Sequence, residues 1–502
     1  MSQLYRSLGR SPTVVAPRSR SYHGPFGRLF PQLAPWAPDT TTDLDTFFMD
    51  FANDHMVERV DTAPSALLGS VTELESEFNG GIPAGYTYFG QFVDHDITFD
   101  PTPSGLRSVD PSGLLNFRTP RLDLDCVYGR GPDDQPYFYD GAHPKGAERF
   151  LVGQVPGSTL RDVPRNTVGR ALIGDMRNDE NSIVSQLQLA FLLAHNTLVD
   201  RAEQADSPRP FDDARRTLTW LYQWVLWHDF VRRIAVDEVW NCALRRTDGC
   251  GGRTVWERQL TDVYDWKHQP FMPVEFSGAA YRFGHSMARN AYQTNDPHRG
   301  FQSFAPLFDN SGPADPDDLR GFRPMLAKNV PQWDWFLPMQ SSGGPFPQMA
   351  RRIDTKLSNA LSFLHEGPAN SPQNVLAFLN LRRGWALELP AGTSVAKHLG
   401  YDPVPIEADE IDSLWFYVLK EAASLPGVNR GAMLGRVGST IVAATFAGLL
   451  AGDPASFVNV EPGWEPRSDP LLVDGQDNVD DPAWTVASII RLAGLPASAG
   501  DF

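Results

Sequence analysis

Apolar side chains recur every three to four residues along several stretches of the chain, which is the spacing of an amphipathic helix. In one of these stretches, Ile183, Leu187, Phe191 and Leu198 fall on the same face. The alternation of apolar and polar residues that is typical of strands is scarce. The predicted helices cover residues 182–202, 218–234, 411–423 and 433–450. The pattern therefore predicts a mainly α-helical fold.

The connections between these helices are rich in turn-forming residues. The chain has 42 glycines and 42 prolines, spread widely, and it contains no internal repeat, which indicates long irregular loops. We expect a single large domain at residues 36–495, with an irregular arm at 1–35 and a short tail at 496–502.

Composition and charge are those of a soluble globular protein, with 41% hydrophobic and 21% charged residues. The net charge of −17 argues against nucleic-acid binding, because phosphates would repel the protein. The apolar run 441–451 is too short to span a bilayer. No apolar segment follows the basic residues of the N-terminus, which form either a short basic arm or an unstructured leader. These residues are Arg6, Arg10, Arg18 and Arg20. We expect no signal peptide, and a cytoplasmic protein or one exported without a cleavable signal.

Three cysteines are too few for a disulfide framework. Cys242 and Cys250 can pair in an oxidising compartment, whereas in a reducing cytosol they stay thiols.

A group of polar residues interrupts the apolar segment FGQFVDHDIT at residues 89–98. On a helix, Gln91 and His95 are one turn apart and can face the same cavity. Asp94 and Asp96 flank the histidine and point to different sides. Taken alone, the segment also fits a histidine on a solvated helix face.

A second polar group, GDMRNDEN at residues 174–181, precedes the helix predicted at 182–202. Arg177 and Glu180 are three residues apart and can share one side of a turn. Taken alone, a run of Asp and Asn is typical of a helix-capping segment.

Two further groups lie in the second half of the chain, YRFGHSM at residues 281–287 and LNLRRG at 379–384. His285 has small and apolar neighbours, with Arg282 three positions before it. A lone histidine in such surroundings is also compatible with plain core packing, and LNLRRG with the polar end of a helix.

Together and in this order, the four motifs make the chain similar to the animal-type haem peroxidase family, also called the peroxidase–cyclooxygenase superfamily, and in particular to its bacterial members. The resemblance runs from about residue 80 to 400, with a fainter echo in FGRLFP at residues 26–31. It implies a single large helical haem-peroxidase domain that binds haem b, in agreement with the helical periodicity.

The resemblance assigns the catalytic residues above the iron. His95 is implied as the base that takes a proton from one peroxide oxygen and returns it to the other, a general acid–base effect of roughly 10²–10⁴-fold. Gln91 is implied to line the peroxide or halide pocket. Arg177 matches the family's arginine, whose fixed charge stabilises the negative charge that develops as the O–O bond breaks.

The resemblance also assigns the residues that hold the haem. His285 is implied as the axial iron ligand, with Asn380 accepting the other ring N–H. Arg282 and Arg383 match arginines that bind the haem propionates. Asp94 and Glu180 match carboxylates that form ester bonds to haem methyl groups in some members, and whether either bond forms here stays open. Asn181 excludes the methionine–haem link of some mammalian members.

A calcium site is implied by the loop TPRLDLD at residues 119–125, which is followed by Val127-Tyr128-Gly129. Hard oxygen ligands suit Ca²⁺. The ligands would be the side chains of Asp96, Thr119, Asp123 and Asp125 and the main-chain oxygen of Arg121. Taken alone, the loop also fits a run of solvated acids. A bound ion would hold the helix of His95 in place.

Two departures from the family affect the functional interpretation. The family's basic run after the proximal asparagine is replaced here by GWALE at residues 384–388, which leaves the roles of these residues open. Fatty-acid oxygenases of the superfamily carry a tyrosine three positions before the proximal histidine. Here that position is Arg282, with Tyr281 one position further back, which favours a peroxidase.

We therefore expect a haem peroxidase that reduces hydrogen peroxide and oxidises a halide, thiocyanate or small phenolic donor. The alternatives are a haem-dependent fatty-acid dioxygenase, a non-catalytic haem- or calcium-binding interaction protein, and a metal hydrolase that uses Asp94, His95 and Asp96. His195 and His228 are interpreted as packed structural histidines.

Overall fold

The computed structural model describes most of the chain beyond its first 25 residues. The described residues are 26–40, 43–58, 79–99, 118–141, 149–249, 253–266, 270–301, 303–308, 317–339, 346–362, 374–473 and 484–502. The N-terminal arginines discussed above and Cys250 lie outside these ranges.

The described residues are mainly helical, as the sequence predicts. The α-helices are α2 (Leu44–Phe51), α4 (Gly85–Ile97), α5 (Asp125–Tyr128), α6 (Ser182–Gln204), α7 (Pro210–Val225), α8 (Arg232–Ile234), α9 (Asp237–Ala243), α10 (Val274–Gly278), α11 (Gly284–Met287), α12 (Asp296–Arg299), α13 (Asn359–Ser362), α14 (Leu376–Ala386), α15 (Gly392–His398), α16 (Leu414–Ala423), α17 (Arg436–Gly452), α18 (Phe457–Val460) and α19 (Val486–Leu492). Two tighter turns matter for the site, the 3₁₀ segments η6 (Met176–Asp179) and η8 (Ala280–Phe283).

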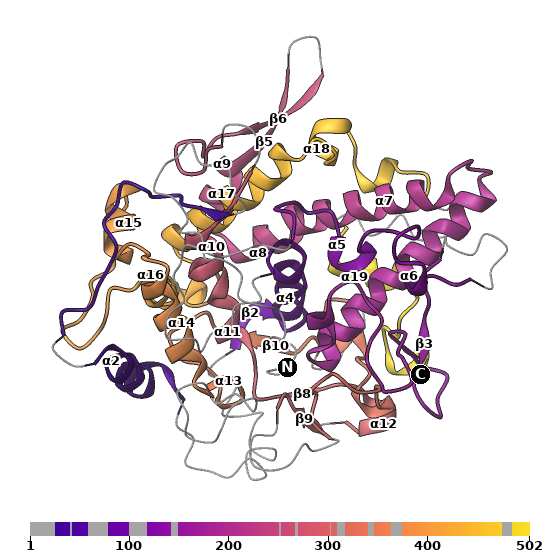
Figure 1. The fold of residues 1–502 in the computed structure, drawn as a ribbon, viewed down its shortest axis with the longest axis horizontal. Coiled ribbons are helices and arrows are strands. Elements are labelled where there is room, and N and C mark those ends of the chain that lie inside the picture. The colour runs from indigo at the N-terminus through magenta and orange to yellow at the C-terminus, as the bar shows by residue number, and fades with distance from the viewer. Residues whose placement is uncertain are drawn as a thin grey trace.

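Strands are short, and in the described residues they pair only two at a time. The pairs are β1 (Phe26–Gly27) with β7 (Met272–Pro273), β2 (Asn79–Pro83) with β10 (Met349–Arg351), β3 (Gly153–Gln154) with β4 (Arg161–Asp162), β5 (Leu244–Asp248) with β6 (Thr254–Arg258), and β8 (Ala291–Gln293) with β9 (Phe304–Pro306). The β1–β7 pair is parallel and the others are antiparallel. The β5–β6 hairpin projects from the body (Figure 1).

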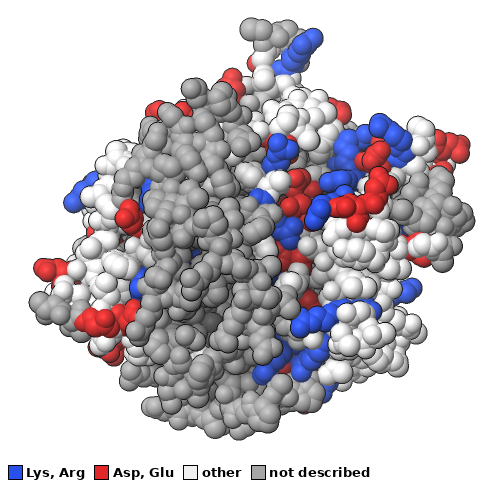
Figure 2. Space-filling view, in the orientation of Figure 1, with Lys and Arg blue, Asp and Glu red and all other residues white. Residues whose placement is uncertain are grey.

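The core is built around α6, which packs against α7, α4 and α19. Figure 1 places α4 near the middle of the molecule, with α6 on one side and α11 and α14 on the other. By length and composition α6 is apolar enough to cross a membrane, but 83% of its most apolar window is buried. Because a core helix meets the same criterion, this burial accounts for its composition. Figure 2 shows basic and acidic side chains interspersed on one face rather than separated into large patches.

The predicted helix at 218–234 corresponds to the second half of α7, a π-helical turn η7 (Leu226–Val231) and α8. The wider turn of a π-helix inserts an extra residue into the helix. It directs the Asp229 carboxylate to the hydroxyl of Tyr86, which donates a hydrogen bond at 2.6 Å. The same carboxylate accepts from the main-chain N–H of Val486 at 3.0 Å. Asp229 thus joins the start of α4 to the start of α19.

Both ends of the described chain pack on the body. Leu29 N–H and Phe30 N–H donate to the buried Glu275 carboxylate on α10 at 3.0 and 3.2 Å, and Arg28 donates to the main-chain oxygen of Leu387 at 2.9 Å. At the other end, Asp334 N–H donates to the oxygen of Ala497 at 2.9 Å.

Candidate active site

The helix α4, which carries Gln91 and His95, is fixed by an apolar face. Phe89, Phe92 and Val93 are fully buried, and this burial stabilises the helix by roughly 1.5–3 kcal/mol for each side chain. At the start of the helix, a Cβ on Gly85 would lie 2.7 Å from the main-chain oxygen of Phe336. Glycine there lets the two backbones meet, and Gly85 N–H donates to this oxygen at 2.8 Å. The position of α4 is therefore set before its polar side chains are considered.

His95 is buried on α4 and its imidazole is oriented by two amide side chains. Its Nδ1 lies 2.7 Å from Oδ1 of Asn178 on η6, and Nδ2 of Asn178 donates to Oε1 of Gln188 at 2.7 Å. Because the amide oxygen accepts, the proton of the neutral ring resides on Nδ1 and Nε2 keeps its lone pair. Burial, followed by the charge of Arg177, lowers the pKa of His95 to about 4. The imidazole is therefore a neutral base at physiological pH.

Arg177 lies on η6, and its guanidinium is held at the C-terminal end of α4. Its Nη2 donates to the main-chain oxygens of His95 at 3.1 Å and Thr98 at 2.6 Å. Nε and Nη2 both donate to the Asp175 carboxylate, at 3.1 and 2.8 Å. Burial opposes the charge of Asp175, but Arg177 and Arg118 together lower the pKa of Asp175 below its ordinary range. Arg177 therefore stays charged beside His95, and among the described residues its Nη1 has no hydrogen bond.

Gln91 lies one turn before His95 and contacts the segment after Arg177. Its Nε2 donates to the Glu180 carboxylate at 3.1 Å, and its Oε1 accepts from Nδ2 of Asn181 at 3.1 Å. Asp94, on the same helix, accepts from the hydroxyl of Thr98 at 3.0 Å. Gln91, Asp94 and Glu180 are each half-buried.

His285 lies at the start of α11, which packs directly against α4. Nδ2 of Asn380 on α14 donates to Nδ1 of His285 at 2.9 Å, and Oδ1 of the same amide accepts from Nη1 of Arg282 at 3.2 Å. Arg282 Nε donates to the oxygen of Ser277 at 2.9 Å. Burial, followed by the charge of Arg282, lowers the pKa of His285 to about 3. Arg383 is half-buried one turn after Asn380.

A hydrogen bond joins the two histidine-bearing segments. The hydroxyl of Tyr281, four positions before His285, donates to the main-chain oxygen of Gly90 on α4 at 3.1 Å. The Tyr281 ring stacks on Phe276 at 4.5 Å between centroids. The elements that carry His95 and His285 are thus braced against each other.

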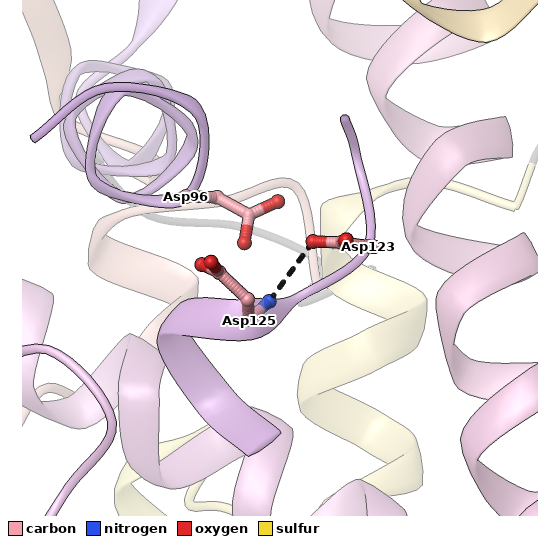
Figure 3. Close-up of side chains that lie close together, drawn as sticks. All are labelled: Asp96, Asp123 and Asp125. Atoms are coloured by element: carbon pink, nitrogen blue, oxygen red, sulfur yellow. Dashed lines mark hydrogen bonds between the residues drawn. The ribbon is translucent and has the colours of Figure 1, made fainter. Parts of the chain in front are cut away.

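Three carboxylates, Asp96, Asp123 and Asp125, form what we call the acidic trio. Ligand oxygens of all three lie within 4.8 Å of one another, and Figure 3 shows them converging from α4 and from the start of α5. Burial, followed by the charges of Asp125 and Asp123, raises the pKa of Asp96, and burial raises that of Asp125 to about 7. The raised pKa values show that it costs free energy to keep these carboxylates charged so close together. A hard cation such as Ca²⁺ would offset that repulsion.

The remaining residues of the predicted calcium loop lie beside the acidic trio. The hydroxyl of Thr119 donates to Asp123 at 2.9 Å, and both Thr119 and Arg121 are exposed. Leu124 adopts a left-handed conformation with φ of 57°, so its N–H and that of Cys126 reach the Asp96 carboxylate at 3.3 and 3.4 Å.

The two histidines outside the motifs are packed among aromatic rings. His195 is fully buried, with its Nδ1 3.0 Å from the hydroxyl of Tyr128. His228 lies against Trp224 with 4.0 Å between ring centroids. Both arrangements agree with the structural roles expected from the sequence.

The sequence motifs did not single out four residues that orient the site. Asn178 and Gln188 hold His95, and Asp175 holds Arg177. The fourth, Arg118, joins the acidic trio to Asp175, through ion pairs of 2.9 Å to Asp125 and 2.5 Å to Asp175. The only hint in the sequence is that three of these residues lie close to a predicted site residue. Asp175 and Asn178 flank Arg177, and Arg118 directly precedes the predicted calcium loop.

Sequence comparison relates the chain to haem peroxidases. A sequence model of the animal haem peroxidase family matches residues 107–326. A peroxidase-like protein of Margaritifera margaritifera is 23% identical over 265 residues, which are 42% of this chain and 32% of that protein. The match thus spans about a third of the length of that relative.

Structural comparison gives the same fold over the whole chain. Peroxidase A from Dictyostelium discoideum superposes with a TM-score of 0.58 and 13% identity, covering 98% of each chain. The fatty acid alpha-dioxygenase of Oryza sativa superposes with a TM-score of 0.52 and 14% identity, covering 100% of this chain and 87% of that one.

Proposed function

A sequence model of the animal haem peroxidase family matches residues 107–326, and we propose that the chain belongs to this family, binds haem b with His95 and His285 on its two sides and reduces hydrogen peroxide. The observation that carries this proposal is the pair of neutral imidazoles, each held by an asparagine, on two elements in direct contact. The electron donor would be a halide, thiocyanate or a small phenol.

The residues on the proximal side fit a haem. A neutral imidazole is the form that binds iron, and the lowered pKa of His285 keeps the ring neutral. A Cβ on Gly284 would meet no heavy atom within 4 Å, so the position beside His285 borders open space. For Nε2 to bind iron, Nδ1 must carry the proton, so the amide oxygen of Asn380 must turn to face it. Arg282 and Arg383 would then bind the propionates.

The residues of the distal side supply proton transfer. Haem, when bound, supplies the electrons that reduce the peroxide. Nε2 of His95 takes a proton from one peroxide oxygen and returns it to the other, since its partner Asn178 keeps the opposite nitrogen protonated. Gln91, held by Glu180 and Asn181, presents a polar side chain on the same helix face.

Arg177 would stabilise the negative charge that develops on the departing oxygen. Four hydrogen bonds hold its Nε and Nη2, and Nη1 is left for a ligand. A group so fixed does not have to reorganise during the reaction, which is why preorganised charge is effective in catalysis.

The calcium and covalent-haem assignments belong to the same proposal. The acidic trio, with Thr119 and the main-chain oxygen of Arg121, would bind Ca²⁺ and hold the end of α4 beside His95. Asp94 and Glu180 are the carboxylates available for ester bonds to haem. Acid–acetone extraction tests those bonds, because free extraction of the haem contradicts both.

A fatty-acid dioxygenase is the second candidate, favoured by the full-length superposition on the rice enzyme. The position three before His285 is Arg282, and the hydroxyl of Tyr281 is engaged with the main chain of Gly90. A non-catalytic haem scaffold would not need Gln91, His95 and Arg177 together. A hydrolase built on Asp94, His95 and Asp96 lacks support, because Asp96 groups with the calcium loop and not with His95.

The deciding experiment is the absorption spectrum of the purified chain with added haem. We expect a Soret band that His285→Ala abolishes or shifts and that His398→Ala, a change at an exposed histidine on α15, leaves intact. A chain without a Soret band, or one in which His285→Ala has no effect, contradicts the proposal. Loss of peroxide reduction in both His95→Ala and Arg177→Ala, with the band retained, would support the distal roles.

A further inference from the structure

A continuous chain of ion pairs runs from the acidic trio to Arg177. Nη1 of Arg118 contacts the Asp125 carboxylate at 2.9 Å, and Nη2 contacts Asp175 at 2.5 Å. Asp175 in turn contacts Nη2 of Arg177 at 2.8 Å. Two residues, Arg118 and Asp175, therefore stand between the calcium loop and the arginine of the distal pocket.

The intermediate residues are shielded from solvent. The side chain of Arg118 is 12% exposed and that of Asp175 is 2% exposed. Charges in such surroundings interact more strongly than on the surface, because water screens them less. A planar guanidinium with two separate nitrogens can hold two carboxylates at once, which a lysine cannot do with the same geometry.

We propose that Arg118 and Asp175 are positioning residues that couple cation binding at the acidic trio to the hold on the Arg177 guanidinium. The inference rests on the proposed function, because that function is what gives Arg177 a catalytic role. It adds a regulatory link between two sites that the family resemblance treats separately.

The charges of the connected groups are consistent with such a link. The acidic trio and Asp175 contribute four carboxylates, and Arg118 and Arg177 contribute two guanidiniums, so the fully ionised network carries two excess negative charges. One divalent cation neutralises that excess. Arg118 then acts as a counter-ion that Asp125 and Asp175 share while the cation is absent.

The direction of the coupling follows from competition for Arg118. A cation on the acidic trio takes up the charge of Asp125, so Arg118 pairs more fully with Asp175. Asp175 then holds Arg177 less strongly, while the main-chain oxygens of His95 and Thr98 still keep the guanidinium in place. By reciprocity, loosening Arg177 from Asp175 must strengthen cation binding.

The test is a double-mutant cycle on the full chain, with the calcium dissociation constant measured by calorimetry as the readout. The variants are Arg177→Gln, Arg118→Gln and the double variant. Removing Arg177 leaves Asp175 to draw Arg118 away from Asp125, so we expect calcium to bind about fivefold tighter or more. In the Arg118→Gln background the same change should alter the affinity by less than about twofold, because the connection is already broken.

Non-additivity separates this link from simple electrostatics, which acts in both backgrounds alike. Equal effects of Arg177→Gln in the two backgrounds overturn the proposal, as does absence of calcium binding by the unaltered chain. Arg165→Gln is the matched control, since Arg165 pairs with Asp162 and Asp179 and not with this network. It should leave the coupling between positions 118 and 177 unchanged.

If Arg118→Gln does not fold, as judged by circular dichroism, Arg118→Lys replaces it. Lysine keeps the charge but cannot bridge both carboxylates. The coupling free energy between positions 118 and 177 should therefore fall to less than half of its value. Retained coupling in Arg118→Lys contradicts the proposal. The readout needs no haem, so a chain that lacks a Soret band but shows the coupling refutes only the peroxidase function. A chain with a Soret band and no coupling refutes only the link.

Discussion

The hydrogen bond between His95 and Asn178 makes the acid side of the pH–rate profile predictable. The substitution Asn178→Asp places a carboxylate oxygen where the amide oxygen now lies, 2.7 Å from Nδ1. An opposite charge at this range favours the protonated imidazole and raises a histidine pKa by about 1–3 units. Asn178 is fully buried, so burial of the new carboxylate offsets part of the gain.

Starting from a pKa of about 4 for His95, we expect about 5 to 6 in the Asn178→Asp variant. Each unit corresponds to about 1.4 kcal/mol of added preference for the protonated ring. The base must be neutral to accept a proton, so kcat/KM for hydrogen peroxide falls as the pH drops through this pKa. The acid limb should therefore move from about pH 4 to about pH 5–6.

The assay is steady-state kcat/KM for peroxide from pH 3.5 to 8, with the Soret band recorded at each pH. Asn178→Leu is the control of similar volume. Leucine at this position no longer fixes which ring nitrogen of His95 carries the proton. We therefore expect the plateau of kcat/KM to fall by about tenfold or more, while the pKa of the acid limb does not rise. An acid limb that stays at about pH 4 in Asn178→Asp, with haem retained, refutes the assignment of His95 as the base.

Three further predictions concern stability and the choice of reaction. Burial raises the pKa of Glu421 from 4.5 to about 7 although it accepts N–H bonds from the start of α17. The free energy of unfolding therefore falls by about 3 kcal/mol as the pH rises from 4.5 through 7. Urea unfolding at pH 5 and pH 8 measures this fall, and Glu421→Gln should abolish it. The same pH dependence in the variant and the unaltered chain would contradict the prediction. Chelation should lower Tm, since calcium at about 100 times its Kd contributes about 2.7 kcal/mol, and Asp123→Asn should show no such effect; an unaltered chain insensitive to chelator contradicts this. Tyr281→Phe should leave kcat/KM for peroxide within about twofold, and a variant that instead loses oxygen uptake with a fatty acid identifies a dioxygenase.

The helical part of the fold was predictable because its signal is local. The spacing of Ile183, Leu187 and Phe191 located α6 to within two residues at its end, and α16 begins only three residues after the predicted start at 411. The π-helical turn η7 was not predicted, because a single extra residue in a helix leaves the apolar periodicity almost unchanged. The partners of Asp229 in this turn, Tyr86 and Val486, are distant in sequence, so no local pattern contains them.

The candidate site also has a part that local sequence motifs predicted and a part that depends on contacts between distant residues. The motifs supplied the residues to which we assign the chemistry, and those assignments stay predictions. Residues such as Asn178 and Arg118 are defined by what they contact, and contacts between residues distant in sequence leave no regular spacing in the sequence. Asn181 shows why local interpretation was ambiguous. Its Oδ1 caps α6, as a helix-capping segment would, while its Nδ2 holds Gln91 in the site.

The carboxylate of Asp229 also sets an order of events during synthesis. It joins Tyr86 on α4 to the N–H of Val486, roughly 400 residues later in the chain. At about 5–20 residues per second, a ribosome needs on the order of 20 to 80 s to make that stretch. Throughout this interval Asp229, the partner of Tyr86 on α4, lacks its own contact with α19. The contact between Asp229 and α19 can therefore form only once the chain up to residue 486 has been made, and the start of α4 is fully anchored only from then on.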